Sequence, residues 1–223
     1  MKNLIVIGDS FCSDPKGWPE TLANKLELNL ICHGQGGQPW WNARTFITAL
    51  PSDTIDNAEY IVFAHTNKDR IPTSNEEIGK IDHSKPPKSE IEQAIHLYFK
   101  YIQDPGFIGW AHEQWFIEIS RVWGHKKLCH LHCFPWTVSS SHLLTGLNID
   151  TNLTALSLNE LGVTHFNLFN DKRTNHFNQN NNYQLALQLA ERLENYDIKS
   201  VSLDVNKFDQ ATSYWLDIGT RWP

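Results

Sequence analysis

The alternation of short apolar runs with helix-like segments is the feature that most restricts the fold of this chain. Apolar runs at residues 4–7, 28–32 and 58–64 predict three buried strands. Segments with helical spacing begin at Trp18 and at Trp40 and connect these runs. Strand, helix, strand, helix, strand with short connections is typical of a parallel sheet covered by helices on both faces.

Beyond residue 67 the sequence predicts a loop and further helices and strands. In chain order they are a loop (68–88), a helix begun by a Ser89–Glu92 capping box, a helix (about 108–123), a strand (127–134), a helix (about 152–161), a strand (164–168) and a helix capped by Asn178. We therefore predict one α/β domain over residues 1–223, a three-layer α/β/α sandwich with a mostly parallel, five-stranded sheet. Residues of about 68–126 are expected to form a helical insertion, and about 197–223 a C-terminal extension with a candidate strand at 201–203.

Composition and charge exclude several classes of protein. The 223 residues suffice for one large domain with a real core. A net charge of −6 without a basic stripe argues against a nucleic-acid partner. No apolar run approaches the roughly 20 residues of a membrane span, and the first run is shorter than the core of a signal peptide, about 7–15 residues. We therefore expect a cytoplasmic protein whose four cysteines are thiols; the sequence does not indicate its oligomeric state.

Polar residues and glycines follow the predicted strands. Gly8-Asp9-Ser10 ends the first, a glycine-rich segment up to Gly37 follows the second, and Asn67 follows the third. A further polar segment, 171–176, follows the predicted strand at 164–168. The carboxyl ends of parallel strands share one edge of the sheet, so these segments are expected to converge on one cleft.

Four sequence blocks that contain these segments resemble those of the SGNH hydrolases, also called the GDSL esterase/lipase family. They are Val6-Ile7-Gly8-Asp9-Ser10-Phe11, Cys32-His33-Gly34-Gln35-Gly36-Gly37, His65-Thr66-Asn67-Lys68 and Asn175-His176-Phe177-Asn178. The blocks occur in the family's order. The third departs from the family's usual Gly-x-Asn-Asp, because His65 and Lys68 replace its glycine and its final acid.

The resemblance implies an α/β/α fold and an ester hydrolase that needs no cofactor and no metal. Ser10 would be the nucleophile, and His176 would take its proton as general base. The backbone N–H groups of Ser10 and Gly37, with the Asn67 amide, would stabilise the tetrahedral oxyanion. Taken singly, Gly37 and Asn67 could also be turn residues, and His176 a solvated histidine before a helix.

The third member of the catalytic group is where the sequence departs most from the family. The family usually carries an acid three residues before the histidine, and this chain has Arg173 there. Arginine has no acceptor for an imidazole proton. We expect Asp171 to orient His176; a dyad without an acid and an inactive site are the alternatives.

The segment Cys129-His130-Leu131-His132-Cys133 contains ligand types that zinc prefers. In a strand, however, the two cysteines face one side and the two histidines the other, so the four side chains cannot converge. We therefore predict a packed strand and no metal site.

Tryptophan is abundant, with nine residues. Three of them follow predicted strand ends and are expected to line the substrate cleft: Trp40, Trp41 and Trp136. Three others are expected to pack in the core: Trp110, Trp115 and Trp123.

The leading functional hypothesis is a serine esterase acting on a small acyl ester, with O-acetyl groups on a carbohydrate as the narrower expectation. Its partner would be a small-molecule or glycan ester. A catalytically inactive glycan-binding module of the same fold is the first alternative. A thioesterase or lysophospholipase is the second.

Overall fold

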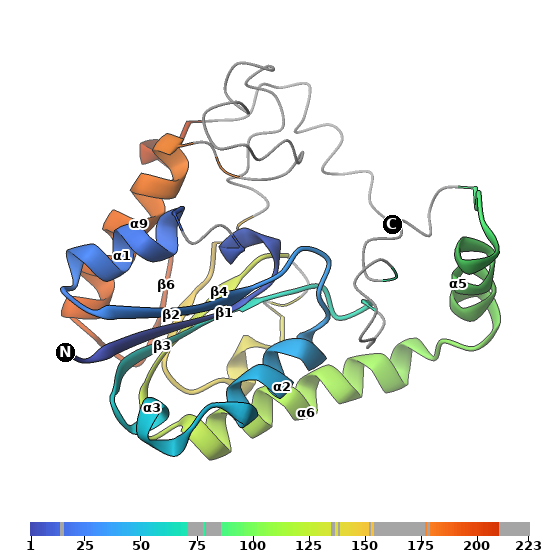
Figure 1. The fold of residues 1–223 in the computed structure, drawn as a ribbon, viewed down its shortest axis with the longest axis horizontal. Helices are drawn as coiled ribbons and strands as arrows, with labels where there is room; N and C mark the ends of the chain where they lie inside the picture. The colour runs from blue at the N-terminus through green and yellow to red at the C-terminus, as the bar shows by residue number, and fades with distance from the viewer. Residues whose placement is uncertain are drawn as a thin grey trace.

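A parallel sheet forms the centre of the computed structural model, which describes residues 1–13, 16–70, 78, 86–134, 137, 139–151, 153, 177 and 179–209 (Figure 1). Its strands are β1 (Asn3–Gly8), β2 (Asn29–Gly34), β3 (Ala58–His65), β4 (Lys127–His132), β5 (Leu147–Ile149) and β6 (Ser200–Val201). Their order is β2-β1-β3-β4-β5-β6, and all neighbouring pairs are parallel. The predicted α/β class and parallel sheet are confirmed.

The predicted number of five strands is wrong, because the described residues contribute six. β5 has only three residues, Leu147–Ile149, and this is too short for an apolar run to stand out in the sequence. β6 overlaps the candidate strand at 201–203. The predicted strand at 164–168 lies outside the described residues, as does nearly all of the predicted helix at about 152–161.

Helices cover both faces of the sheet, which confirms the predicted three layers (Figure 1). α1 (Trp18–Lys25) and α9 (Gln179–Glu194) lie on one face. α2 (Trp40–Ala49), the short α3 (Ser52–Asp56) and α6 (Pro105–Trp123) lie on the other.

Successive residues of β1 point into the two layers in turn. Leu4 and Val6 belong to the core that α9 closes with its predicted leucine face: Leu185, Leu189 and Leu193. Ile5 and Ile7 belong to the second core, which α6 closes. This alternation is the period of a strand buried on both faces.

Local capping decides where the helices of the 86–123 region begin. α5 (Glu90–Tyr101) starts as predicted, since the Ser89 hydroxyl accepts the Glu92 N–H at 3.2 Å. α6 starts about three residues before the predicted boundary, at Pro105. There the Asp104 carboxylate accepts the N–H groups of Gly106 and Phe107, at 2.8 and 3.1 Å.

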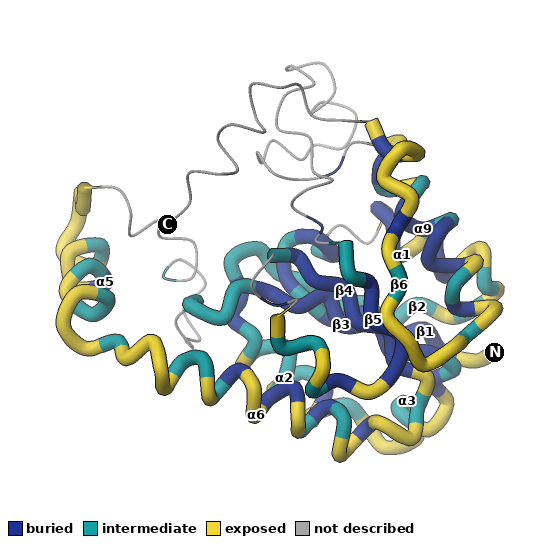
Figure 2. Tube along the Cα trace, turned by 180° about the vertical axis from the view of Figure 1, so that it is seen from behind, coloured by how far each residue is buried: buried dark blue, intermediate teal, exposed yellow. Residues whose placement is uncertain are grey.

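α5 and the first turns of α6 extend beyond the sheet and are largely exposed (Figures 1 and 2). Trp115 and Trp123 are buried in the core, as predicted. The prediction for Trp110 is wrong, because its side chain is 56% exposed. Five residues along a helix turn a side chain by about 140°, so Trp110 cannot share the buried face of Trp115.

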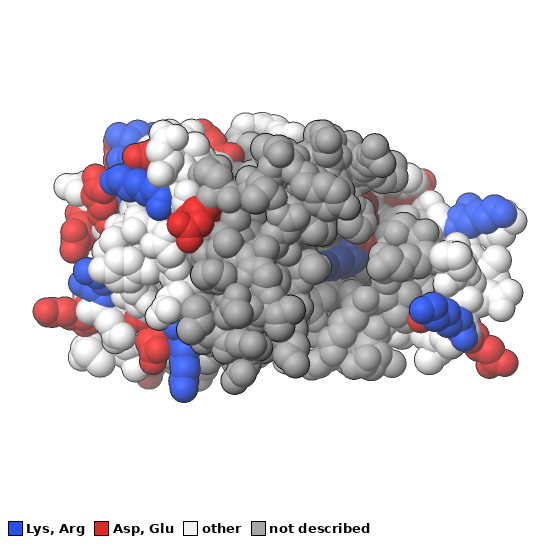
Figure 3. Space-filling view, turned by 90° about the horizontal axis from the view of Figure 1, so that it is seen from above, with Lys and Arg blue, Asp and Glu red and all other residues white. Residues whose placement is uncertain are grey.

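The described surface shows mixed charge. In the view from above, acidic and basic side chains are interspersed over the described atoms rather than gathered by sign (Figure 3). None of the helices in the described ranges is long and apolar enough to cross a membrane.

Candidate active site

The strand order places a topological switch point between β1 and β3. The chain leaves β1 for β2 on one side and returns on the other side as β3. Open α/β sheets bind their ligands in the crevice at the carboxyl ends of such strands. Ser10 follows β1, Gly37 follows β2 and Asn67 follows β3.

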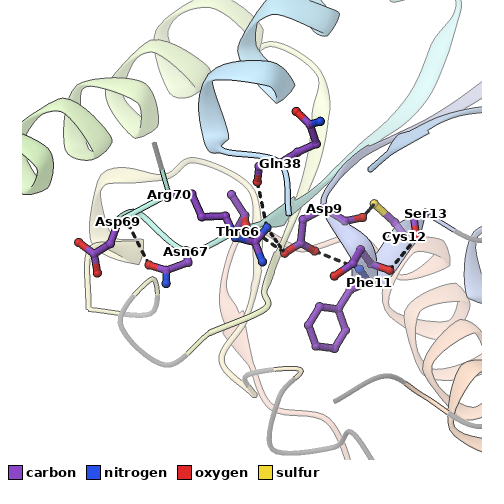
Figure 4. A network of polar contacts seen from close by, with 10 residues as sticks. Asp9, Phe11, Cys12, Ser13, Gln38, Thr66, Asn67, Asp69 and Arg70 are labelled. Atoms are coloured by element: carbon purple, nitrogen blue, oxygen red, sulfur yellow. Dashed lines mark hydrogen bonds and ion pairs between the residues drawn. The ribbon is translucent and has the colours of Figure 1, made fainter. Parts of the chain in front are cut away.

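The buried carboxylate of Asp9 lies at the centre of this edge (Figure 4). Its Oδ1 accepts the backbone N–H of Phe11 at 3.0 Å and caps η1 (Ser10–Cys12), a single 3₁₀ turn. Its Oδ2 accepts the Thr66 hydroxyl at 3.0 Å and Nη1 of Arg70 at 3.1 Å. Asp9 therefore joins the end of β1 to the end of β3.

Arg70 extends this network to the loop after β2. The same Nη1 donates to the backbone carbonyl of Gln38 at 2.9 Å (Figure 4). The network residues Asp9, Gln38 and Thr66 are the direct neighbours in sequence of the predicted site residues: Ser10, Gly37 and Asn67. The structure thus ties together the three segments that carry those residues.

Ser10 is partly buried and opens η1 directly after β1. Its carbonyl accepts the hydroxyl of Ser13 at 3.0 Å, which closes the turn. The turn packs closely on the end of β2, where a Cβ on Gly34 would lie 2.5 Å from the carbonyl carbon of Cys12. Only glycine allows this approach, so β2 and the Ser10 turn hold each other in place.

Gly37 and Asn67 have defined local geometry. Gly37 has φ +78°, a conformation that favours glycine, within a turn in which the Gln38 N–H donates to the Gln35 carbonyl at 3.3 Å. The Asn67 side-chain oxygen accepts the Asp69 N–H at 2.9 Å (Figure 4). This bond fixes the amide with its oxygen toward the following turn and its NH₂ group pointing away from that turn.

Trp40 and Trp41 begin α2, immediately after the Gly37 loop. The Trp40 ring stacks on Trp115 of α6, with centroids 6.3 Å apart and an interplanar angle of 23°. Trp41 is 43% exposed, and the guanidinium of Arg44 lies 5.0 Å from the centroid of its ring. Trp40 is thus fixed between helices, whereas Trp41 presents aromatic surface to solvent.

Three predicted site residues lie outside the described residues: His176, Asp171 and Trp136. The pairing of Ser10 with His176 and the orienting role of Asp171 therefore remain predictions.

A cluster of buried histidines lies beside the site, between the sheet and α6. Nε2 of His130 is 3.0 Å from the carbonyl of Thr145, which can only accept, so His130 carries its proton on Nε2. Its Nδ1 then accepts the Nε2 proton of His65 at 3.0 Å. The His65 ring also packs against Phe116 of α6, at 4.5 Å between centroids.

Burial keeps these imidazoles neutral. Desolvation lowers the pKa of His130 to about 3 and the pKa values of His132 and His112 to about 4. Burial also holds the pKa of His65 well below its usual range. None of the four is charged at neutral pH.

The alternation predicted for residues 129–133 agrees with the structure. Cys129 and Cys133 pack in the core below α1 and α9, while His130 and His132 stack near His65 on the α6 side. Within the described ranges, no group of three or more histidine, cysteine or acidic side chains is placed to hold a metal ion.

Thr66 and Arg70 are the network residues that the sequence interpretation did not assign. Both hydrogen-bond to Asp9 across 57 and 61 positions of the chain. The available signal was chemical: an acid at the end of a buried strand needs a partner, and Arg70 is a cation shortly after a neighbouring strand.

Comparison with known proteins yields a distant likeness among solved structures. No family model matches the chain, and no curated protein matches it. Among solved structures, a candidate lipolytic protein of the G-D-S-L family from Desulfitobacterium hafniense DCB-2 is similar, with 12% identity and a TM-score of 0.47. The match covers 86% of this chain and 99% of that one. A similarity of this size assigns neither a family nor a function.

Proposed function

We propose that this protein is a serine esterase that hydrolyses a small acyl ester, with Ser10 as its nucleophile. The observation that carries the proposal is the network of Asp9, Thr66 and Arg70. It joins the strand ends from which Ser10, Gly37 and Asn67 follow, at the switch point where α/β folds bind ligands.

The proposed reaction uses two half-reactions at one centre. The Ser10 hydroxyl oxygen attacks the ester carbonyl while His176 accepts its proton, and Asp171 orients that imidazole. The N–H groups of Ser10 and Gly37 and the NH₂ group of Asn67 donate to the oxyanion. His176 then protonates the departing alcohol, and water attacks the acyl-enzyme by the reverse sequence of proton transfers.

The aromatic surface beside the site supports a carbohydrate ester as the substrate. Trp41 exposes its ring at the start of α2, one turn from the Gly37 loop. An indole face suits stacking on a sugar ring, and removal of an O-acetyl group requires only a small acyl pocket. We propose Trp40, Trp41 and Trp136 as the residues that contact the sugar.

Hydrolysis of p-nitrophenyl acetate by wild type and Ser10→Ala tests the proposal. We expect the Ser10→Ala variant to lose on the order of 10³-fold or more in kcat, as for removal of a serine nucleophile elsewhere. Ser52→Ala, at the start of α3, is the matched control and should retain activity.

Equal rates in wild type and Ser10→Ala would contradict the proposal. Acetylated glycan binding measured by calorimetry on such a protein would then support the inactive binding module. Ser10-dependent cleavage of acyl-CoA or lysophospholipid, with none of acetyl esters, would support the thioesterase or lysophospholipase alternative.

A further inference from the structure

We propose that Arg70 is a positioning residue that fixes the nucleophile turn and the oxyanion loop relative to each other. The nucleophile turn is residues 9–13, and the oxyanion loop is residues 35–38. The inference rests on the proposed function, because it concerns the same site.

One nitrogen atom of Arg70 contacts both segments. Nη1 carries two protons in the guanidinium plane, and it donates to Oδ2 of Asp9 at 3.1 Å and to the carbonyl of Gln38 at 2.9 Å (Figure 4). Asp9 directly precedes Ser10, and Gln38 directly follows Gly37. This atom therefore links the two segments that carry the proposed backbone oxyanion donors, in addition to the packing of Gly34 against Cys12.

Charge makes the contact hard to replace. The Asp9 side chain is fully buried, and that of Arg70 is 18% exposed. The Phe11 N–H and the Thr66 hydroxyl also donate to this carboxylate, but both are neutral, and Arg70 supplies the positive charge that a buried carboxylate favours. The ring of Phe134, 5.5 Å from the guanidinium carbon, restrains Arg70 further.

Loss of the Arg70 contacts is expected to lower activity, because oxyanion donors act only when they are held in position before the reaction. Lysine keeps the positive charge near Asp9, but its side chain is one bond shorter and has no planar guanidinium to pack on the Phe134 ring, so its ammonium does not reach the position from which Nη1 donates to both acceptors. Arg70→Lys is therefore expected to retain the fold, but the position of the oxyanion loop relative to the nucleophile turn is no longer fixed.

The experiment compares wild type with Arg70→Lys, Arg70→Met and the control Lys127→Met. Lys127 forms an ion pair with Glu59 at the opposite edge of the sheet, so its loss removes a cation without touching the site. The readouts are kcat and KM on p-nitrophenyl acetate, thermal unfolding, and hydrogen–deuterium exchange of residues 9–13 and 35–38.

For Arg70→Lys we expect kcat to fall about 10²-fold, the effect of a misplacement near 1 Å, with KM changed less than about twofold. Hydrogen–deuterium exchange should accelerate in both segments together. The control Lys127→Met should change neither kcat nor the exchange of these segments. A kcat within about twofold of wild type would overturn the proposal. So would faster exchange in residues 9–13 alone.

The exchange readout separates this inference from the proposed function. If wild type shows no Ser10-dependent hydrolysis, the esterase proposal fails, yet linked exchange of both segments still supports the Arg70 bridge and unchanged exchange overturns it. If Arg70→Met does not fold, Arg70→Lys decides on the same readouts.

Discussion

Acidification is expected to destabilise this fold through the histidines buried between the sheet and α6. Burial lowers the pKa of His130 to about 3 and those of His112 and His132 to about 4. Since these values lie below the roughly 6.5 of an unfolded histidine, the unfolded chain binds more protons than the folded one. Their contribution to stability is complete above about pH 6.5 and falls as the pH drops toward 4 and 3.

The magnitude follows from the same pKa values. At about pH 5 an unfolded imidazole is almost fully protonated, whereas the buried ones remain almost fully neutral. At 1.36 kcal/mol per pKa unit, each of the three loses roughly 2 kcal/mol of stabilisation between about pH 7 and pH 5. A folded pKa higher by one unit would change this little, because the unfolded state dominates the proton uptake. Together they remove on the order of 5 kcal/mol, comparable with the whole stability of many domains.

Urea unfolding followed by tryptophan fluorescence at about pH 7, 6 and 5 measures this loss. His112→Leu isolates one contributor, because the ring packs on Phe116, with 4.4 Å between centroids, and its Nε2 has no hydrogen-bond partner among the described residues. This variant should lose about a third less stability on acidification. The control His125→Gln changes an exposed imidazole in the turn after α6 and should behave as wild type. A free energy of unfolding that is constant over this pH range would refute the reasoning.

Three further substitutions test the acid, the core and the turn, and a fourth, Gly109→Ala, is the control for the turn. Asp171→Asn should lower kcat by on the order of 10⁴ if this acid orients the general base, and a loss under about tenfold would indicate a dyad. Leu189→Ala empties a fully buried position of α9 and should cost about 2–5 kcal/mol in calorimetry; a smaller loss would mean that the layer is loosely packed. Gly34→Ala places a Cβ 2.5 Å from the carbonyl carbon of Cys12 and should cost about 1–3 kcal/mol and reduce hydrolysis. Gly109→Ala, with nothing within 4 Å, should gain about 0.8–1 kcal/mol by helix propensity, and equal effects of the two would contradict the packing argument.

Elements with a strong local pattern could be predicted from the sequence. β1 is a continuous apolar run, and the leucines of α9 recur every four residues, so the period alone identified both. β5 was missed because three residues carry no period, and its place in the sheet depends on the neighbour it pairs with, β4. The exposure of Trp110 follows from the helical period, which places it about 140° around α6 from the buried Trp115, so the prediction for Trp110 failed because that period was not applied to it.

The location of the candidate site residues at strand ends was predictable, whereas the contacts between their segments were not. Strand ends predicted where Ser10, Gly37 and Asn67 would be, because parallel topology places such ends on one edge. The Asp9–Arg70 contact joins residues 61 positions apart and lies in a polar segment without periodicity. Only the folded chain shows which cation reaches the buried acid.

The two departures in the third block have local structural explanations. His65 stands where the resemblance leads us to expect glycine, and its ring turns away from the strand end to hydrogen-bond with His130 beneath α6. Lys68 replaces the expected acid, and its ammonium lies 3.5 Å from the carboxylate of Asp69. Neither residue displaces the Asn67 amide, which keeps its bond to the Asp69 N–H. These two departures are therefore compatible with the proposed oxyanion role of Asn67.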